Sequence, residues 1–193
     1  MNLKHPSALS WRNHFAFRGQ PFPIMLRPWI TDTGSLTQKL RQASAGQFEL
    51  CLLNSQWQTP KPDERHALSL PERQTALVRE VLLKGKNQPW IYARSIIPRT
   101  SFIGPLQSFK HGSHQPLGEI LFNHPKIIRR PAQFAHGSLA QLTSTDLSYH
   151  HCNMENSVWA RRSVFDLDNA LLLVMEVFLP DLPEYPRIGV SFR

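Results

Sequence analysis

The chain has 193 residues, of which 41% are hydrophobic and 19% are charged, so it can bury one ordinary core and does not have the composition of a disordered segment. No run of about 18 apolar residues occurs, so no membrane-spanning helix is predicted. The net charge of +8 indicates either an anionic partner or simply a basic surface. Because the basic residues are scattered and form no tract, we do not expect a nucleic-acid-binding protein.

The first part of the chain predicts an extension, a helix and a strand. Residues 1–24 mix aromatic, proline and basic residues without periodicity, and we expect an N-terminal extension there. Residues 31–44 carry leucines at helical spacing behind Ser35, a residue suited to the N-cap position. Residues 47–54 then predict a strand, and residues 55–67, which are rich in proline and charge, predict a loop.

A hairpin is predicted in the middle of the chain. Ser69 and Glu72 have the spacing of a capping box, which predicts a short helix leading into a strand around residues 79–84. The sequence KGKN marks a tight turn, and residues 88–98 form the returning strand. Side chains alternate along this strand between the two faces of a sheet, with Arg94 on the face of the even-numbered residues.

The second half of the chain predicts helices, a long loop and a second hairpin. Residues 104–124 indicate two short helices separated by a break. Residues 131–157 are rich in His, Ser, Thr and Asn, and we expect a long loop or insert there. Residues 159–180 form the clearest hairpin, with the turn residues Asp168–Asn169 between two β-rich runs. Residues 186–193 are expected to be an irregular tail.

These elements predict an α+β fold in one domain, built on a single, mainly antiparallel sheet with short helices packed on it. Cys51 and Cys152 are too few for a disulfide framework, and the first residues lack the apolar core of a signal peptide, so we expect a cytoplasmic protein. The His-His-Cys run at residues 150–152 has no second cluster at ligand spacing, so no metal site is expected.

One carboxylate interrupts the apolar strand LLLVMEVFLP, residues 171–180. A buried Glu176 needs a cation, hydrogen bonds or a cavity made for a polar ligand. Arg79 and Arg94 each interrupt an apolar strand, LVREVLL and WIYARSII, and are the natural partners. The pattern leaves two interpretations open, a structural ion pair or edge charges on the one hand and a polar pocket on the other. Two arginines exceed what one glutamate needs, and the surplus positive charge would suit a small organic dianion.

Three blocks of the sequence resemble the chorismate lyase family. They are REVLLKGKNQPWIYARSIIP (79–98), PLGEILF (116–122) and WARRSVFDLDNALLLVMEVFLP (159–180), with a fainter match at GSLTQKL (34–40). The resemblance covers residues 25–185 and implies an antiparallel sheet whose ligand is buried beneath helical flaps. It also implies conversion of chorismate to 4-hydroxybenzoate and pyruvate, the first step of ubiquinone synthesis, without metal or organic cofactor. We expect a monomer with no nucleic-acid partner.

The same resemblance implies roles for five residues. Carried over by position, Arg79 binds a carboxylate of the ligand, and Glu176 hydrogen-bonds the ring hydroxyl and helps to remove the neighbouring ring proton. Leu117 of the P-L-G motif and Leu36, where the family has methionine, form apolar walls. Arg94 matches a family arginine and would stabilise charge on the departing enolpyruvyl group. Arg79 and Glu176 are thus the expected catalytic residues, and all five are expected to bind substrate.

A non-catalytic function is the alternative for the same fold. Some transcription regulators use this fold as an effector-binding domain behind a winged-helix DNA-binding segment. Only about 30 residues precede the matched domain here, so we expect the enzyme rather than a small-carboxylate effector-binding domain. The segment 131–157 is longer than expected for the family, and neither end of the chain has a clear counterpart in it.

Overall fold

The computed structural model describes residues 10–13, 22–111 and 115–185. Within these residues eight strands form one antiparallel sheet in the order β1-β6-β7-β8-β4-β3-β2, and β5 pairs with β7 beside that path. The strands are β1 (Arg12–Asn13), β2 (Phe48–Gln58), β3 (Ala76–Gly85), β4 (Gln88–Pro98), β5 (Ile127–Arg129), β6 (Gln133–Ser138), β7 (Ser157–Leu167) and β8 (Ala170–Phe178). The predicted fold class is confirmed.

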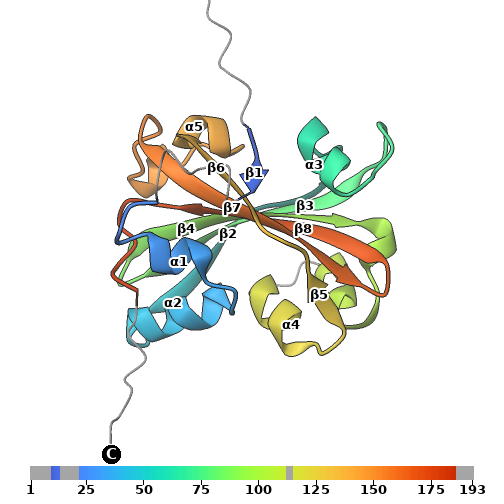
Figure 1. Ribbon diagram of the computed structural model, residues 1–193, viewed down its shortest axis with the longest axis horizontal. Helices are drawn as coiled ribbons and strands as arrows, with labels where there is room; N and C mark the ends of the chain where they lie inside the picture. The colour runs from blue at the N-terminus through green and yellow to red at the C-terminus, as the bar shows by residue number, and fades with distance from the viewer. Residues whose placement is uncertain (1–9, 14–21, 112–114, 186–193) are drawn as a thin grey trace, which may run out of the picture.

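Short helices cover both faces of this sheet. They are α1 (Arg27–Thr31), α2 (Leu36–Ser44), α3 (Pro62–Ala67), α4 (Leu117–Asn123) and α5 (Leu139–Leu142), with the 3-10 turns η2 (Arg99–Ser101), η3 (Gly104–His111) and η4 (Ser148–His150). Figure 1 shows the sheet nearly edge-on, with α1, α2 and α4 on one side, here called the front face, and α3 and α5 on the other, the back face. No helix among the described residues is long and apolar enough to cross a bilayer.

Each face has its own apolar core, because side chains alternate along the strands. On the front face, one cluster combines Trp29 and Ile30 of α1 and Leu40 of α2 with Val81 and Ile91 of the sheet. A second cluster combines Phe109 of η3 and Leu121 of α4 with Ile97, Phe165 and Leu172 of the sheet. The back-face core includes Val78, Leu82, Tyr92, Leu139, Leu142, Leu173 and Val177. A residue's position along its strand therefore decides which core it joins.

The second hairpin forms as predicted and its register is uninterrupted. Its turn consists of Asp168 and Asn169, both with positive φ, as in the tight turns that match the twist of a hairpin. β7 and β8 then pair without a shift, from Leu167 opposite Ala170 to Trp159 opposite Phe178. The position of the turn thus determines which residues of the two strands lie opposite each other.

The first hairpin also forms as predicted, but it contains a β-bulge. Lys84 pairs with Pro89, whereas Leu83 pairs with Ile91, which leaves Trp90 as an extra residue in β4. Because a shift of one residue exchanges the two faces of a strand, every residue of β4 after Trp90 changes face relative to an uninterrupted hairpin.

The structure corrects two local expectations. No helix forms at Ser69–Glu72; Ser69 has a φ of 54°, and Leu70 precedes a proline, which disfavours helical geometry. The helix lies earlier, in the predicted loop, where α3 begins at Pro62 and the backbone N–H of Lys61 donates to Glu64 Oε2 at 2.8 Å.

The expected loop at 131–157 contains strand β6 and helix α5, so it supplies part of the sheet. The expected tail, 186–193, lies outside the described residues.

Candidate active site

A narrow cavity lies between the front face of the sheet and the helices α2 and α4. Its walls include Arg79, Val81 and Leu83 of β3, Ala93 and Ser95 of β4, Val174 and Glu176 of β8, Leu36 and Thr37 of α2, and Leu117, Gly118 and Phe122 of α4. The volume is about 40 Å³, enough for a few water molecules. Pockets for small organic ligands usually measure about 300–1,000 Å³. The structure is therefore a closed form, and the covering helices must move before such a ligand can enter.

The two covering helices contact each other directly above the cavity. A Cβ on Gly118 would lie 2.8 Å from Thr37 Oγ1, so α4 approaches α2 as closely as a glycine allows. At the surface, Arg41 Nε and Glu119 Oε1 form an ion pair at 2.7 Å. Leu36 and Leu117, the first residues of α2 and α4, both line the cavity, so the structure brings these two expected residues together.

Arg79 is a buried cation without a counterion. Its exposure is 3%, and among the described residues no carboxylate forms an ion pair with it. Its Nη2 donates to the carbonyl of Gln115 at 3.2 Å, while its Nε has no hydrogen-bond partner in the part of the chain that the structure describes. Burial lowers the pKa of the guanidinium to about 10. An anionic ligand would supply the missing hydrogen-bond acceptors and the missing charge.

Glu176 is paired with Arg161, a residue that the sequence interpretation did not select. The two lie directly opposite each other on β8 and β7, with 2.7 Å between Arg161 Nε and Glu176 Oε2. The expected partners were Arg79 and Arg94, and this pairing corrects that expectation. The uninterrupted register from the Asp168–Asn169 turn already places residue 161 opposite residue 176, so a signal for Arg161 was present in the sequence.

A second cation, Arg129 of β5, lies near this pair. Burial and the charge of Arg161 lower the pKa of Arg129, whereas Glu176 and Asp32 oppose that change. Arg129 Nε donates to Ser163 Oγ at 3.0 Å and its Nη1 donates to the carbonyl of Thr33 at 3.2 Å. Within the described part of the chain it forms no ion pair. Arg79 and Arg129 are therefore the two arginines near Glu176 that form no ion pair within the described residues, and of the two Arg79 lines the cavity.

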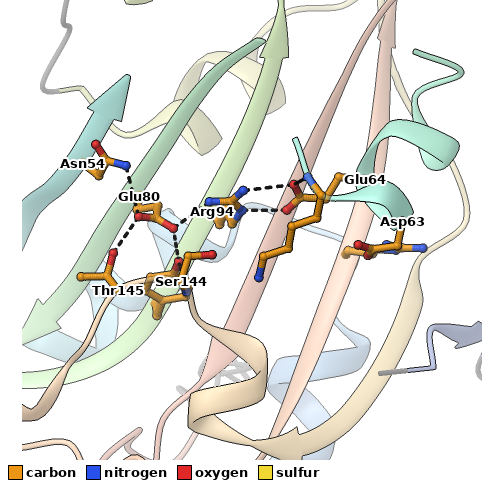
Figure 2. Close-up of polar contacts among 10 residues, drawn as sticks. Asn54, Asp63, Glu64, Glu80, Arg94, Ser144 and Thr145 are labelled. Carbon is orange, nitrogen blue, oxygen red and sulfur yellow. Dashed lines mark hydrogen bonds and ion pairs between the residues drawn. The ribbon is translucent and has the colours of Figure 1, made fainter. Parts of the chain in front are cut away.

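Arg94 lies on the back face, away from the cavity. Because of the bulge at Trp90, Arg79 pairs with Ser95 and Arg94 pairs with Glu80. Arg94 binds Glu64 through Nε and Nη2, at 2.7 and 3.1 Å, and Glu80 through Nη1 at 2.8 Å (Figure 2). The expectation that Arg94 shares a pocket with Glu176 is wrong, and the structural ion pair is the correct interpretation for this arginine.

The buried network around Arg94 satisfies its carboxylates completely. Glu80 also accepts hydrogen bonds from Thr145 at 2.7 Å and Asn54 at 3.4 Å (Figure 2). It accepts another from Tyr92 at 2.6 Å. Burial alone would raise the pKa of Glu80, but the hydrogen bonds from Tyr92, Thr145 and Arg94 lower it overall. The network joins α3, β2, β3, β4 and the segment after α5, which is a structural role.

No metal site is found among the described residues. No three His, Cys, Asp or Glu side chains in that part of the chain are grouped to hold an ion. The run at residues 150–152 lies at the end of η4, and burial raises the pKa of the Cys152 thiol. A buried thiol of this kind behaves as a small apolar side chain.

Comparison with known proteins agrees with the three sequence blocks. The family model described as Chorismate lyase matches residues 8–189. The chain belongs to the chorismate lyase family. It is 39% identical over 171 residues to a probable chorismate pyruvate-lyase of Aromatoleum aromaticum, and the aligned region covers 85% of this chain and 89% of that protein. It is 37% identical over 174 residues to a probable chorismate pyruvate-lyase of Pseudomonas syringae pv. syringae, covering 90% of this chain and 89% of that protein.

Solved structures of much lower identity share the fold of this family member. The C-terminal domain of PhnF has a TM-score of 0.55 at 8% identity, covering 71% of this chain and 86% of that one. A GntR-family transcriptional regulator from Bacillus cereus has a TM-score of 0.53 at 11% identity, covering 74% and 99%. At such identities the likeness shows the fold alone.

Proposed function

We propose that this protein is a chorismate lyase that converts chorismate to 4-hydroxybenzoate and pyruvate. The observation that carries the proposal is that Arg79 is buried in the same cavity as Glu176 and has no counterion among the described residues. Family membership and the names of the relatives support the choice of substrate. By the same resemblance, the reaction is proposed to be the first step of ubiquinone biosynthesis, carried out in the cytoplasm by a monomer.

The polar groups that line the cavity match the two ends of 4-hydroxybenzoate, which could enter once the covering helices move apart. This molecule is flat, with a carboxylate at one end of an aromatic ring and a hydroxyl at the other. Arg79 would bind the carboxylate with its guanidinium fork, and Glu176 would accept a hydrogen bond from the hydroxyl. Leu36 and Leu117 would pack on the ring from the covering helices. Each polar group of the ligand then meets a group that is otherwise incompletely bonded.

The reaction requires little covalent chemistry from the protein. The bond between the ring carbon and the ether oxygen breaks, and the enolpyruvyl group leaves with the electron pair. The ring carbon that carries the hydroxyl loses its proton to Glu176, and the electrons of that C–H bond complete the aromatic ring. The leaving enolate takes up a proton and becomes pyruvate, so atoms and electrons balance without an oxidant or reductant. Positioning and electrostatic stabilisation are the main contributions of the site.

The direct test is incubation of purified protein with chorismate, followed by measurement of 4-hydroxybenzoate absorbance and released pyruvate in equal amounts. We expect Glu176→Gln to lower turnover by about 10²-fold or more, since it removes the proton acceptor. Arg130→Met is the control, because Arg130 is exposed and pairs with Asp166 at the surface. Tight 4-hydroxybenzoate binding without turnover would instead assign the chain to the non-catalytic class.

A further inference from the structure

Arg161 holds one side of the carboxylate that the proposed reaction uses. Its exposure is 1%, and its Nε lies 2.7 Å from Glu176 Oε2. No described residue donates a hydrogen bond to the other oxygen of Glu176, Oε1. The ion pair therefore occupies one carboxylate oxygen and leaves the second available to a ligand in the cavity.

The guanidinium of Arg161 is itself held from the opposite side. Its Nη1 donates to three backbone carbonyls at and after α1, those of Asp32 at 2.5 Å, Ile30 at 3.2 Å and Trp29 at 3.4 Å. Carbonyl groups at the end of a helix favour a cation. Because these bonds and the bond to Glu176 use different nitrogens of one planar group, Arg161 has a single orientation and imposes it on Glu176.

Arg161 does not line the cavity that contains Arg79. It lines a separate groove on the other side of Glu176, together with Asp32 and Arg129. Of the residues that Arg161 contacts through its side chain, Glu176 is the one that lines the cavity, so Glu176 is the direct link between Arg161 and a ligand beside Arg79. Without the ion pair to Arg161, the carboxylate of Glu176 would be free to rotate, for example toward the buried cation Arg79 in the same cavity, and would no longer be aimed at the ring proton.

We propose that Arg161 is the positioning residue of this site, which holds the carboxylate of Glu176 aimed into the cavity without touching the ligand. The inference rests on the proposed function and assigns a task to a residue outside the cavity. It predicts that loss of Arg161 affects the proton-transfer step more than it affects binding of the ring.

The test compares two adjacent arginines of β7 that face opposite ways. Arg161→Met should lower kcat by about 10²-fold, the size of a general-base contribution, while Kd for 4-hydroxybenzoate changes several times less. The acid limb of the kcat/KM profile should move to higher pH, since removal of a cation favours the protonated carboxyl. Arg162→Met is the control, because Arg162 is 8% exposed and pairs with Asp63 on the back face at 2.7 Å. The acid limb of the kcat/KM profile should not move in Arg162→Met.

A second measurement does not depend on turnover. Carbon-13 NMR of labelled glutamate carboxyls, with Glu176 assigned from the Glu176→Gln spectrum, gives the titration of Glu176 directly. Its midpoint should rise in Arg161→Met and stay in place in Arg162→Met. If Arg161→Met does not fold, Arg161→Lys replaces it, because lysine keeps the charge but cannot reach Glu176 and the carbonyls together. A lower kcat is then the expected result.

The two hypotheses fail in different ways. A wild-type protein that releases no 4-hydroxybenzoate refutes the proposed function, and the NMR titration still decides the role of Arg161. An active wild type combined with a folded Arg161→Met that has the same kcat, acid limb and Glu176 midpoint overturns the positioning role.

Discussion

The indole ring of Trp90 lies across Gly85, so closely that a Cβ on Gly85 would fall 2.1 Å from it. Trp90 is the extra residue of the bulge in β4, and its ring joins the front-face core with Val81 and Ile91. The absent side chain of Gly85 provides the space for that ring. The packing of these two residues thus stabilises the shift in register.

Substitution of Gly85 tests the importance of this packing. Gly85→Ala should lower the free energy of unfolding by about 1–3 kcal/mol, because the ring or the backbone must move. Urea denaturation measures the change. In the double variant Gly85→Ala with Trp90→Leu, the additional cost of the alanine should largely disappear, since the smaller side chain leaves room for the new methyl group. Equal stability of Gly85→Ala and wild type would contradict this account.

Replacement of Arg79 should separate binding from stability. Arg79→Met removes the guanidinium that would hold the ligand carboxylate, so affinity for 4-hydroxybenzoate should fall by about 10²-fold. The free energy of unfolding should rise by about 1 kcal/mol or more, because the variant no longer buries a cation without a counterion. Calorimetric titration and urea denaturation measure the two effects. A variant that binds normally would remove Arg79 from the site.

The same substitution on the neighbouring strand should have the opposite effect on stability. Arg94→Met leaves Glu64 and Glu80 buried without their cation, which should lower the free energy of unfolding by about 3–5 kcal/mol. In conditions where the variant remains folded, its affinity for 4-hydroxybenzoate should stay within a few-fold of wild type, because Arg94 faces away from the cavity. A selective loss of affinity with normal stability would return Arg94 to the active site.

Glu80 should make stability depend on acid pH. Its pKa in the folded protein is below the ordinary value of 4.5, so the unfolded chain binds more protons in this range. The stabilisation is therefore complete above pH 4.5 and is lost as the pH falls through the folded-state pKa. Urea denaturation between about pH 6 and pH 3 should show a smaller pH dependence in Glu80→Gln than in wild type. Parallel curves for the two proteins would exclude this contribution.

Closure of the covering helices should depend on Gly118. In Gly118→Ala the new methyl group would meet Thr37 Oγ1 at 2.8 Å, so α2 and α4 could not close fully. Dissociation of 4-hydroxybenzoate, followed by stopped-flow displacement, should accelerate by about tenfold, which corresponds to 1.4 kcal/mol. Adding Thr37→Ala should restore slow dissociation because it removes the clashing oxygen. Unchanged dissociation in the single variant would show that this contact does not control closure.

The sequence contained enough information for part of the site. Glu176 is conspicuous as a lone carboxylate in an apolar strand, and the two-residue turn at Asp168–Asn169 fixes its neighbour as Arg161. The pairing of residues 161 and 176 follows from the alternation of side chains along a strand and from the position of the two-residue turn. Arg161 was missed because its guanidinium is buried by backbone carbonyls at and after α1, far away in the sequence.

The face of Arg94 could not be predicted in the same way. If the pairing of Gly85 with Gln88 continued, Arg79 would lie opposite Arg94 on one face, as a simple hairpin requires. The bulge that separates them depends on the packing of Trp90 in the front-face core, which local sequence does not reveal. Glu64, the main partner of Arg94, was hidden for a similar reason, because it lies on α3 in a segment whose prolines and charges predict a loop.

The sheet is a single layer of strands. It separates Glu176, Arg79 and Arg161 on the front face from the ion-pair network of Arg94 on the back face. Redesign of ligand preference can therefore vary Val81, Leu83 and Val174, which line the cavity, while the back-face ion pairs that support folding stay unchanged. A combinatorial library restricted in this way should keep a high fraction of folded members. Because binding and folding depend on residues of opposite faces, ligand preference can be engineered with little loss of stability.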